Sequence, residues 1–344
     1  MLKDAGNYLV YLIFRLFIFL GGHLPMEPTF KVVRAIALIA YQFIPGYRRI
    51  AIRNLEIAFG DKLSPGERER ICKEAFVNLV YSGAEMIFMD EINKNWQEHY
   101  TFEGAEPIDQ HVRKKEPHFV FGGHFGGWMM LSMVGERYKK DNIHGATVMR
   151  HFPNKYIDKY VRDLAVSYNS RFLEIHKTGK QIEQLISEGA MVGFYMDQES
   201  RRHQGIQVDF FGLPAYSHVV PGYLAWKHHL PVYPFWYVRK KPGYFHIIYR
   251  KPIEMSYTGN KEYDIRVITQ NITKEVERTI SDHPEQWLWF HNRWKRTIGE
   301  DKQERKDRGS IKVDKDKYKT GAQVIEEMEE EIGEKKDERA ATPT

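Results

Sequence analysis

The sequence predicts an α/β fold in which a mixed central sheet is flanked by helices, with N-terminal membrane-associated helices and a disordered, charged C-terminal tail. Three observations lead to this fold class. Through the middle of the chain, short apolar runs alternate with helical stretches of about a dozen residues, the pattern of strands joined by crossover helices. Two apolar stretches interrupted by arginine stand near the N-terminus. The segment Glu300–Thr344 consists mainly of charged residues and is too polar to bury a core of its own.

The composition allows one large core with appendages. Of the 344 residues, 42% are hydrophobic and 14% aromatic, enough for a sizeable interior. The one cysteine, Cys72, excludes an internal disulfide and a thiolate metal cluster, and we expect it to be a buried residue on a helix. A net charge of +5 is too mild to indicate nucleic-acid binding. We divide the chain into membrane-anchoring helices over 1–45, an α/β domain over 46–297 and the tail over 298–344.

The first apolar run, Tyr8–Gly22, makes a helix of about 22 Å, which is short against a hydrocarbon core of about 30 Å. Arg15 in its middle costs roughly 3 kcal/mol at the bilayer centre, against about 5 kcal/mol gained from the apolar residues. The run therefore predicts an interfacial anchor, a tilted span or a buried helix. A secretory signal is disfavoured because Gly21–Pro25 offers no cleavage site. Basic residues stand in and around the two N-terminal apolar stretches, as expected for a segment that rests on an anionic membrane surface. They are Lys3, Arg15, Arg34, Arg48, Arg49 and Arg53.

Breaker, capping and periodicity signals predict the elements that follow. The expected helices are Ala35–Ile44, Arg53–Gly60, Glu67–Ile87 with Ser64 as its cap, Gly127–Tyr138, Asn154–Ser167, Gly179–Glu188, Val220–His228 and Tyr263–Asp282. The expected strands are Phe119–Gly122, Gly145–Val148, Met191–Met196, Val232–Arg239 and Tyr244–Tyr249. The last two strands resemble a hairpin across Lys240–Gly243, which makes the sheet mixed.

The last helix leads into an aromatic block with Trp287, Trp289, Phe290 and Trp294. This block predicts either an interfacial aromatic belt or a core-closing C-terminal helix. Within the tail, a helix over Ala322–Ile332 is the one element we expect.

His124 stands on a glycine-lined bend, Phe121–Met129, directly after an apolar strand. A strand that stops at such a turn leaves a side chain at the mouth of the sheet, where it can act on a bound substrate. An imidazole titrates near neutrality and is therefore a candidate general base that needs no metal. The alternative is a structural histidine on a tight turn. A metal site is not expected, because His228 and His229 diverge on their helix and no carboxylate cluster accompanies them.

Further pieces follow His124 in a fixed order. A strand ends in Asp197 and Glu199, Arg201 and Arg202 come next, and then the segment Val208–Ala215 with Gly212. A helix opens near Val220–Gly222, followed by Leu230–Pro234. Together with the Arg53–Leu55 helix and the Trp287–Trp294 block, this set resembles the lysophospholipid acyltransferase superfamily, and within it the bacterial lipid A biosynthesis (late) acyltransferases. The resemblance covers roughly residues 1 to 297.

The resemblance implies transfer of an acyl chain from a thioester on acyl carrier protein or coenzyme A to a lipid hydroxyl. In that reaction His124 deprotonates the hydroxyl, and the imidazolium then protonates the departing thiolate. Backbone N–H groups around Gly126, Gly127 and Gly212 suit the developing oxyanion, because glycine permits close approach. Arg201 and Arg202 are candidates to bind a phosphate of the acceptor or of the donor's phosphopantetheine, and are otherwise surface cations.

One position departs from the family pattern, which is a histidine, four residues, then Asp or Glu. The fifth residue after His124 is Met129, so the acid that orients the imidazole is missing from its usual place. In a serine protease triad, replacing the corresponding acid lowers turnover roughly 10⁴-fold. Asp197 and Glu199, at the end of a neighbouring strand, are the candidates to replace it.

These observations predict an O-acyltransferase that acts on a lipid A precursor or related glycolipid at the cytoplasmic face of the inner membrane, with His124, Asp197 and Glu199 as catalytic residues. No cofactor is expected beyond acyl-carrier-protein or coenzyme A thioester as co-substrate. Two alternatives stay open. One is a degenerate homologue that binds lipid or acyl chains without catalysis, with Met129 as its mark. The other is an acyltransferase for glycerophospholipid or aminolipid acceptors.

Overall fold

A computed structural model of the chain describes residues 2–130, 137–138, 145–168, 170–173, 178–298 and 326. At its centre is a seven-stranded sheet of order β1-β9-β8-β2-β5-β3-β4. The strands are β1 (Tyr100–Glu103), β2 (His118–Gly122), β3 (Gly145–Val148), β4 (Ser170–Leu173), β5 (Met191–Tyr195), β8 (Val232–Lys241) and β9 (Tyr244–Tyr249). The predicted mixed α/β sheet is thereby confirmed, and each of the five expected strands is present.

The sheet is parallel through most of its width. β2 pairs in parallel with both β5 and β8, and β3 pairs in parallel with β4 and β5. β8 and β9 form the predicted antiparallel hairpin, and β1 lies parallel to β9 at the edge. β1 and β4 were not predicted, because each has only four residues and includes an exposed position, so neither produces a strong apolar run.

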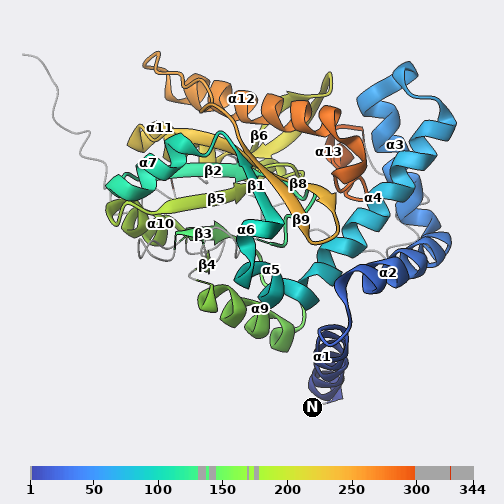
Figure 1. The fold of residues 1–344 in the computed structure, drawn as a ribbon. Coiled ribbons are helices and arrows are strands. Elements are labelled where there is room, and N and C mark those ends of the chain that lie inside the picture. Colours follow the sequence, from blue (N-terminus) through green and yellow to red (C-terminus); the bar gives the residue numbers. More distant parts are fainter. Residues whose placement is uncertain are drawn as a thin grey trace, which may run out of the picture.

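Helices cover both faces of the sheet. Figure 1 shows α11 (Val220–His228) and α12 (Lys261–Asp282) on one face and α9 (Lys155–Ser167) on the other. The remaining helices of the central region are α4 (Pro65–Glu85), α5 (Met89–Lys94), α6 (Trp96–His99), α7 (Glu106–Lys114), α10 (Thr178–Ser187) and α13 (Lys295–Ile298). α4 starts with the expected capping box, in which Ser64 and Glu67 satisfy each other's backbone amides. Cys72 is fully buried on α4, as expected.

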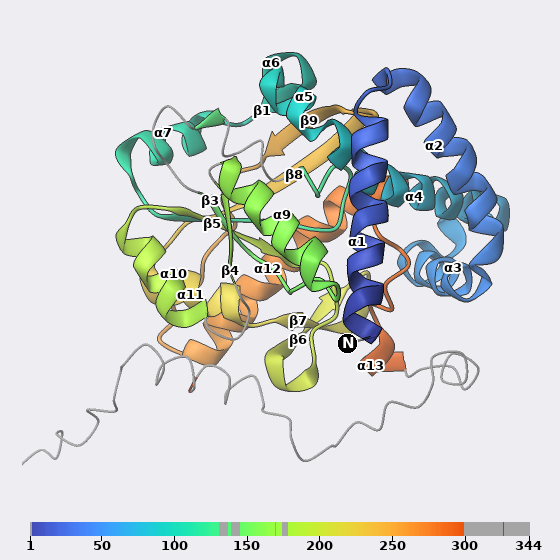
Figure 2. The ribbon, with the colours of Figure 1, turned by 90° about the horizontal axis from the view of Figure 1, so that it is seen from below.

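Three helices precede α4: α1 (Leu2–Gly21), α2 (Met26–Ala40) and α3 (Pro45–Phe59). The expected helix Ala35–Ile44 was wrong at its start, because Pro28 lies in the first turn of α2, where a proline breaks no hydrogen bond. α1 stands apart from the main body in Figure 1 and lies along α9 in Figure 2. Its polar end is held there by an ion pair of 2.6 Å between Asp4 and Lys155.

α1 is long and apolar enough to cross a membrane, judged by length and composition. Only 6% of its apolar window is buried against the protein, which removes the buried-helix alternative. The large apolar side chains that α1 exposes are Tyr8, Leu9, Val10, Leu12, Ile13, Leu16, Phe17, Phe19 and Leu20.

The chain also contains a two-stranded hairpin of β6 (Gly205–Phe210) and β7 (Leu213–His218). It packs on α12 and on the aromatic block after it. In that block Trp287, Trp289 and Trp294 are at most 1% exposed, so the block closes the core and is not an interfacial belt. It does so as turns and a short 3-10 helix, Pro284–Gln286, instead of the regular helix we considered.

Three predictions fall outside the described residues, wholly or in part. They are the disordered tail, its helix over Ala322–Ile332 apart from Glu326, and most of the helix Gly127–Tyr138. The described start of that last segment, Gly126–Met129, is a turn.

Candidate active site

His124 and Asp197 meet because two parallel neighbours in the sheet end side by side. The register of β2 and β5 pairs Gly122 with Tyr195, and the Met196 amide extends the ladder by donating to the Gly122 carbonyl at 3.0 Å. His124 and Asp197 each follow two residues after that last pair. Gly123 permits their approach, since a Cβ there would lie 2.9 Å from Cγ of Asp197.

The Asp197 carboxylate holds His124 at two points. Oδ1 of Asp197 lies 3.0 Å from Nδ1 of the imidazole, and Oδ2 accepts the His124 backbone N–H at 2.9 Å. The indole N–H of Trp287 also donates to Oδ2, at 2.9 Å. The side chain of Asp197 is 1% exposed and that of His124 is 18% exposed. An ionised carboxylate at Nδ1 fixes the proton on that nitrogen and leaves Nε2 as the basic one.

Burial by itself raises the pKa of Asp197, but the neighbouring His124 ring and the hydrogen bonds from His124 and Trp287 outweigh it and lower the pKa to about 2. Asp197 is therefore ionised throughout the neutral range. The geometry is that of a histidine held by a buried acid, and this acid follows β5 instead of standing at the position of Met129.

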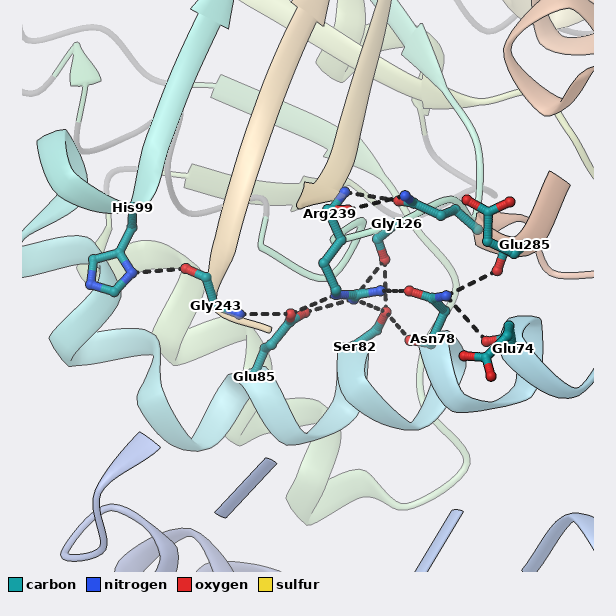
Figure 3. A network of polar contacts seen from close by, with 10 residues as sticks. Glu74, Asn78, Ser82, Glu85, His99, Gly126, Arg239, Gly243 and Glu285 are labelled. Carbon is teal, nitrogen blue, oxygen red and sulfur yellow. Dashed lines mark hydrogen bonds and ion pairs between the residues drawn. The ribbon is translucent and has the colours of Figure 1, made fainter. Parts of the chain in front are cut away.

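A buried ion pair holds the turn after His124 in place. Arg239 on β8 donates to Glu85 on α4 through Nε and Nη2, both at 2.7 Å, and neither side chain is more than 3% exposed. Nη2 also donates to the Gly126 carbonyl at 2.9 Å, and the Ser82 hydroxyl donates to the same carbonyl at 2.8 Å. Figure 3 shows this network between α4 and the end of β8.

The amides of the turn are used within the protein. His124 N–H donates to Asp197, Phe125 N–H to the Gly123 carbonyl at 2.8 Å, Gly126 N–H to Gln286 at 2.9 Å and Gly127 N–H to Tyr237 at 3.2 Å. Gly126 has φ +53°, and a Cβ there would lie 1.8 Å from the Tyr237 carbonyl oxygen. The two glycines therefore serve close packing of the turn on β8, and their amides are not available as the oxyanion donors we expected.

A cavity of about 400 Å³ opens beside the His124 ring. Its lining is mainly apolar and comes from the turn after β2, the ends of β3 and β5 with the segments that follow them, the end of β7 and the start of α11. One residue each comes from α10 and from the C-terminal aromatic block. The polar residues of the lining are His124, Arg150, His151, Gln198, Glu199, His218 and His291. The Gln198 amide nitrogen lies 3.2 Å from Nδ1 and 3.3 Å from Nε2 of His124, so it faces the ring as a whole and leaves the in-plane lone pair of Nε2 open. A mainly apolar cavity with a few convergent polar groups is the usual form of a small-molecule or lipid-chain site.

The second candidate acid, Glu199, also lines this cavity but has other partners than His124. Its carboxylate forms an ion pair with Arg296 and accepts the Arg296 N–H at 2.8 Å. Burial raises the pKa of Glu199 despite these partners. Glu199 thus joins β5 to the C-terminal segment, and the structure brings only Asp197 to the histidine.

The other expected binding residues lie outside the cavity lining. Arg201 and Arg202 are exposed, and Arg202 donates to the Arg296 carbonyl at 3.0 Å. Gly212 is at the tip of the β6–β7 hairpin with φ +75°, and its N–H donates to Asp209 at 3.0 Å. The Gly212 amide is thus used within its own turn, away from the cavity beside His124.

Met129 contributes to a second, smaller apolar cavity of about 40 Å³. Trp128 lies between the two cavities and lines both, with its ring centroid 4.7 Å from that of His124. The remaining lining of the small cavity is Met86, Met89, Met149, Phe152, Val161, Leu164, Ala165, Ser170 and Phe172. An acid at position 129 would enter these apolar surroundings.

Sequence reasoning missed Trp287, Gln198 and His291 as site residues. Of these three residues, Gln198 alone could have been expected at the site, because it stands in the sequence between the candidate acids Asp197 and Glu199. Trp287 and His291 belong to a block whose aromatic content indicated only packing or a membrane surface.

A histidine held by a buried acid, at the carboxyl edge of an α/β sheet and beside a largely apolar cavity, is chemically able to activate a hydroxyl group. The family model of bacterial lipid A biosynthesis acyltransferases matches residues 2–296, and the chain belongs to this family of acyltransferases. No curated protein matches the chain in sequence.

Proposed function

We propose that this protein transfers a fatty acyl chain from an acyl thioester, on acyl carrier protein or coenzyme A, to a hydroxyl of a lipid A precursor or related glycolipid. The family supports acyl transfer in lipid A biosynthesis. The observation that carries the mechanism is the 3.0 Å contact between Asp197 and Nδ1 of His124, beside the 400 Å³ cavity.

In the proposed reaction, Nε2 of His124 takes the proton of the acceptor hydroxyl as its oxygen attacks the thioester carbonyl. The tetrahedral intermediate collapses, the C–S bond breaks, and the imidazolium returns the proton to the thiolate. Asp197 keeps the proton of the ring on Nδ1 and stabilises the imidazolium. Glu199 acts by shaping the cavity and contacts no reacting atom.

We propose that α1 anchors the protein in the cytoplasmic membrane, with the site open to the cytoplasm. The exposed apolar side chains of α1 and the contact of α1 with α9 support this arrangement, because α9 follows the cavity-lining segment 148–153. A lipid acceptor would then reach the cavity along α1. Arg201 and Arg202 remain proposed contacts for a phosphate outside the cavity.

The test is transfer of labelled acyl groups from carrier-protein and coenzyme A thioesters to mixed lipid acceptors, by membranes that carry the wild type or His124→Ala. We expect product from the wild type and a loss of at least 10³-fold in the variant, at unchanged thermal stability. Near-normal turnover by the variant removes His124 from the mechanism. Product on a glycerophospholipid or aminolipid reassigns the acceptor, and no product with any donor supports the non-catalytic alternative.

A further inference from the structure

Acyl transfer as proposed above passes through a tetrahedral intermediate whose oxygen carries negative charge and needs a fixed hydrogen-bond donor. The four amides from His124 to Gly127 already have partners, so the donor has to be another group that lines the cavity. We infer that His291 is a catalytic residue whose Nδ1–H donates a hydrogen bond to this oxyanion. The inference rests on the proposed function and adds a role for a residue of the C-terminal aromatic block.

The protonation of His291 follows from its contacts. Its Nε2 accepts the backbone N–H of Glu199 at 3.0 Å, and since an amide N–H can only donate, Nε2 must carry a lone pair. A neutral imidazole with its lone pair on Nε2 has its proton on Nδ1. Burial lowers the pKa of His291 to about 4, so the ring is neutral at pH 7 and this tautomer is the populated one.

The described contacts of His291 involve Nε2 and the backbone carbonyl, and none of them involves Nδ1. The ring lines the same cavity as His124 and Gln198. Nδ1–H is therefore a hydrogen-bond donor without a partner among the described residues, on a ring that lines the same cavity as the candidate base.

His291 is also held in place, which is what an oxyanion donor requires. The Glu199 amide fixes the ring, and Asn54 on α3 donates to the His291 carbonyl at 2.7 Å. Among the other N–H groups of the lining, His151 contacts Asp158 and the Gln198 amide faces the His124 ring. No hydrogen bond among the described residues fixes the side-chain nitrogens of Trp128, Arg150 or His218. A donor that is already oriented costs no reorganisation when the charge appears.

The acceptor O–H proton moves to Nε2 of His124, the new O–C bond forms, and the carbonyl π pair moves to oxygen, where His291 Nδ1–H donates to it. When the carbonyl re-forms, the C–S bond breaks and the thiolate takes the proton back from His124. His291 keeps its own proton throughout, so it acts as a neutral donor and not as an acid.

A matched pair of variants tests this role. His291→Asn places an amide nitrogen close to the former Nδ1 and keeps a donor there, whereas His291→Leu has similar bulk and no donor. Both lose the acceptor for the Glu199 amide, so a purely structural effect of that bond is common to both. We expect kcat to fall about 10²–10³-fold in His291→Leu with KM changed less than threefold, and to fall less than tenfold in His291→Asn.

Nitrogen NMR of the histidine-labelled wild type gives an independent readout, in which Nδ1 of His291 should appear protonated and Nε2 unprotonated at pH 7. Equal kcat losses in the two variants, a kcat of His291→Leu within threefold of wild type, or a proton on Nε2 would each overturn the inference. Those outcomes leave the proposed function intact. If the proposed function itself fails, the wild type gives no more product than His124→Ala.

Discussion

Replacing Asp197 by asparagine tests the central pair most directly, because the hydrogen bonds dictate how the new amide must lie. Oδ2 of Asp197 accepts two donors, the His124 amide and the Trp287 indole, each at 2.9 Å. The amide oxygen of Asp197→Asn has to take this place. The NH₂ group then faces Nδ1 of His124 and donates to it, which moves the ring proton to Nε2 and abolishes the base.

The expected size follows from the role of this contact. An acid-to-amide change that leaves the geometry intact but inverts the tautomer lowers kcat about 10⁴-fold in a serine protease triad. We expect a loss of about 10³–10⁴ in kcat here, or about 4–5.5 kcal/mol of transition-state stabilisation, with little change in KM. Because the pKa of Asp197 is already lowered to about 2, its contribution to stability is present above about pH 4 and is lost only as the pH falls toward 2.

The assay is acyl transfer from a labelled thioester at pH 7, with kcat and KM determined separately. Asp264→Asn is the matched control, since Asp264 is equally buried and accepts hydrogen bonds from Ser256 and Thr258 outside the cavity. We expect that variant to lose stability and retain its kcat. A folded Asp197→Asn protein with kcat within tenfold of wild type would refute the role we give to this carboxylate.

Three further predictions concern stability and the missing acid. The substitution Arg239→Met removes the guanidinium and leaves Glu85 buried without its partner, so it should lower the free energy of unfolding by about 3–5 kcal/mol in urea titrations. A change below 1 kcal/mol would contradict a stabilising role for the Arg239–Glu85 ion pair. Met129→Glu places a carboxylate among apolar side chains and should lower stability by about 1–3 kcal/mol without raising kcat; a gain in kcat would show that Asp197 is an incomplete substitute. His118 is fully buried, and burial lowers its pKa to about 4. Between about pH 6.5 and pH 4, His118 is therefore protonated in the unfolded chain but neutral in the folded one, and the folded state loses stability as the pH falls. At pH 5 this costs about 2 kcal/mol relative to pH 7, and His118→Phe should abolish that part of the acid sensitivity in denaturation curves.

Local patterns predicted much of the sheet. The β8–β9 hairpin followed from two apolar runs and a short polar connection, and the helices α9 to α12 followed from amphipathic spacing and caps. The missed strands β1 and β4 lie at the two edges, where half-exposed short segments carry little periodic signal. The sequence predicts the start of α2 too late, because its prolines indicate a break although they fit the cap and first turn of a helix.

The site was predictable only in part, for a topological reason. β5 ends beside β2, its parallel neighbour, and both Asp197 and Glu199 follow β5 closely. From their positions in the sequence alone, the two acids were therefore equal candidates to contact His124. The choice between them depends on Arg296, which holds Glu199 from 97 residues further along the chain. Likewise, the amides of Gly126 and Gly127 are occupied by carbonyls of Gln286 and Tyr237, and a local glycine pattern contains no information about such distant partners.

The short run from Gln286 to His291 has a consequence for how the protein matures. It supplies the indole that bonds Asp197, the carbonyl that holds Gly126 and the ring beside the cavity. During translation α1 emerges from the ribosome long before this run, so a membrane anchor can be seated while the reaction centre is still unassembled. If α1 anchors the protein as proposed, a nascent chain would reach the membrane before its site is assembled, and the site would form only when the segment from Gln286 to His291 docks.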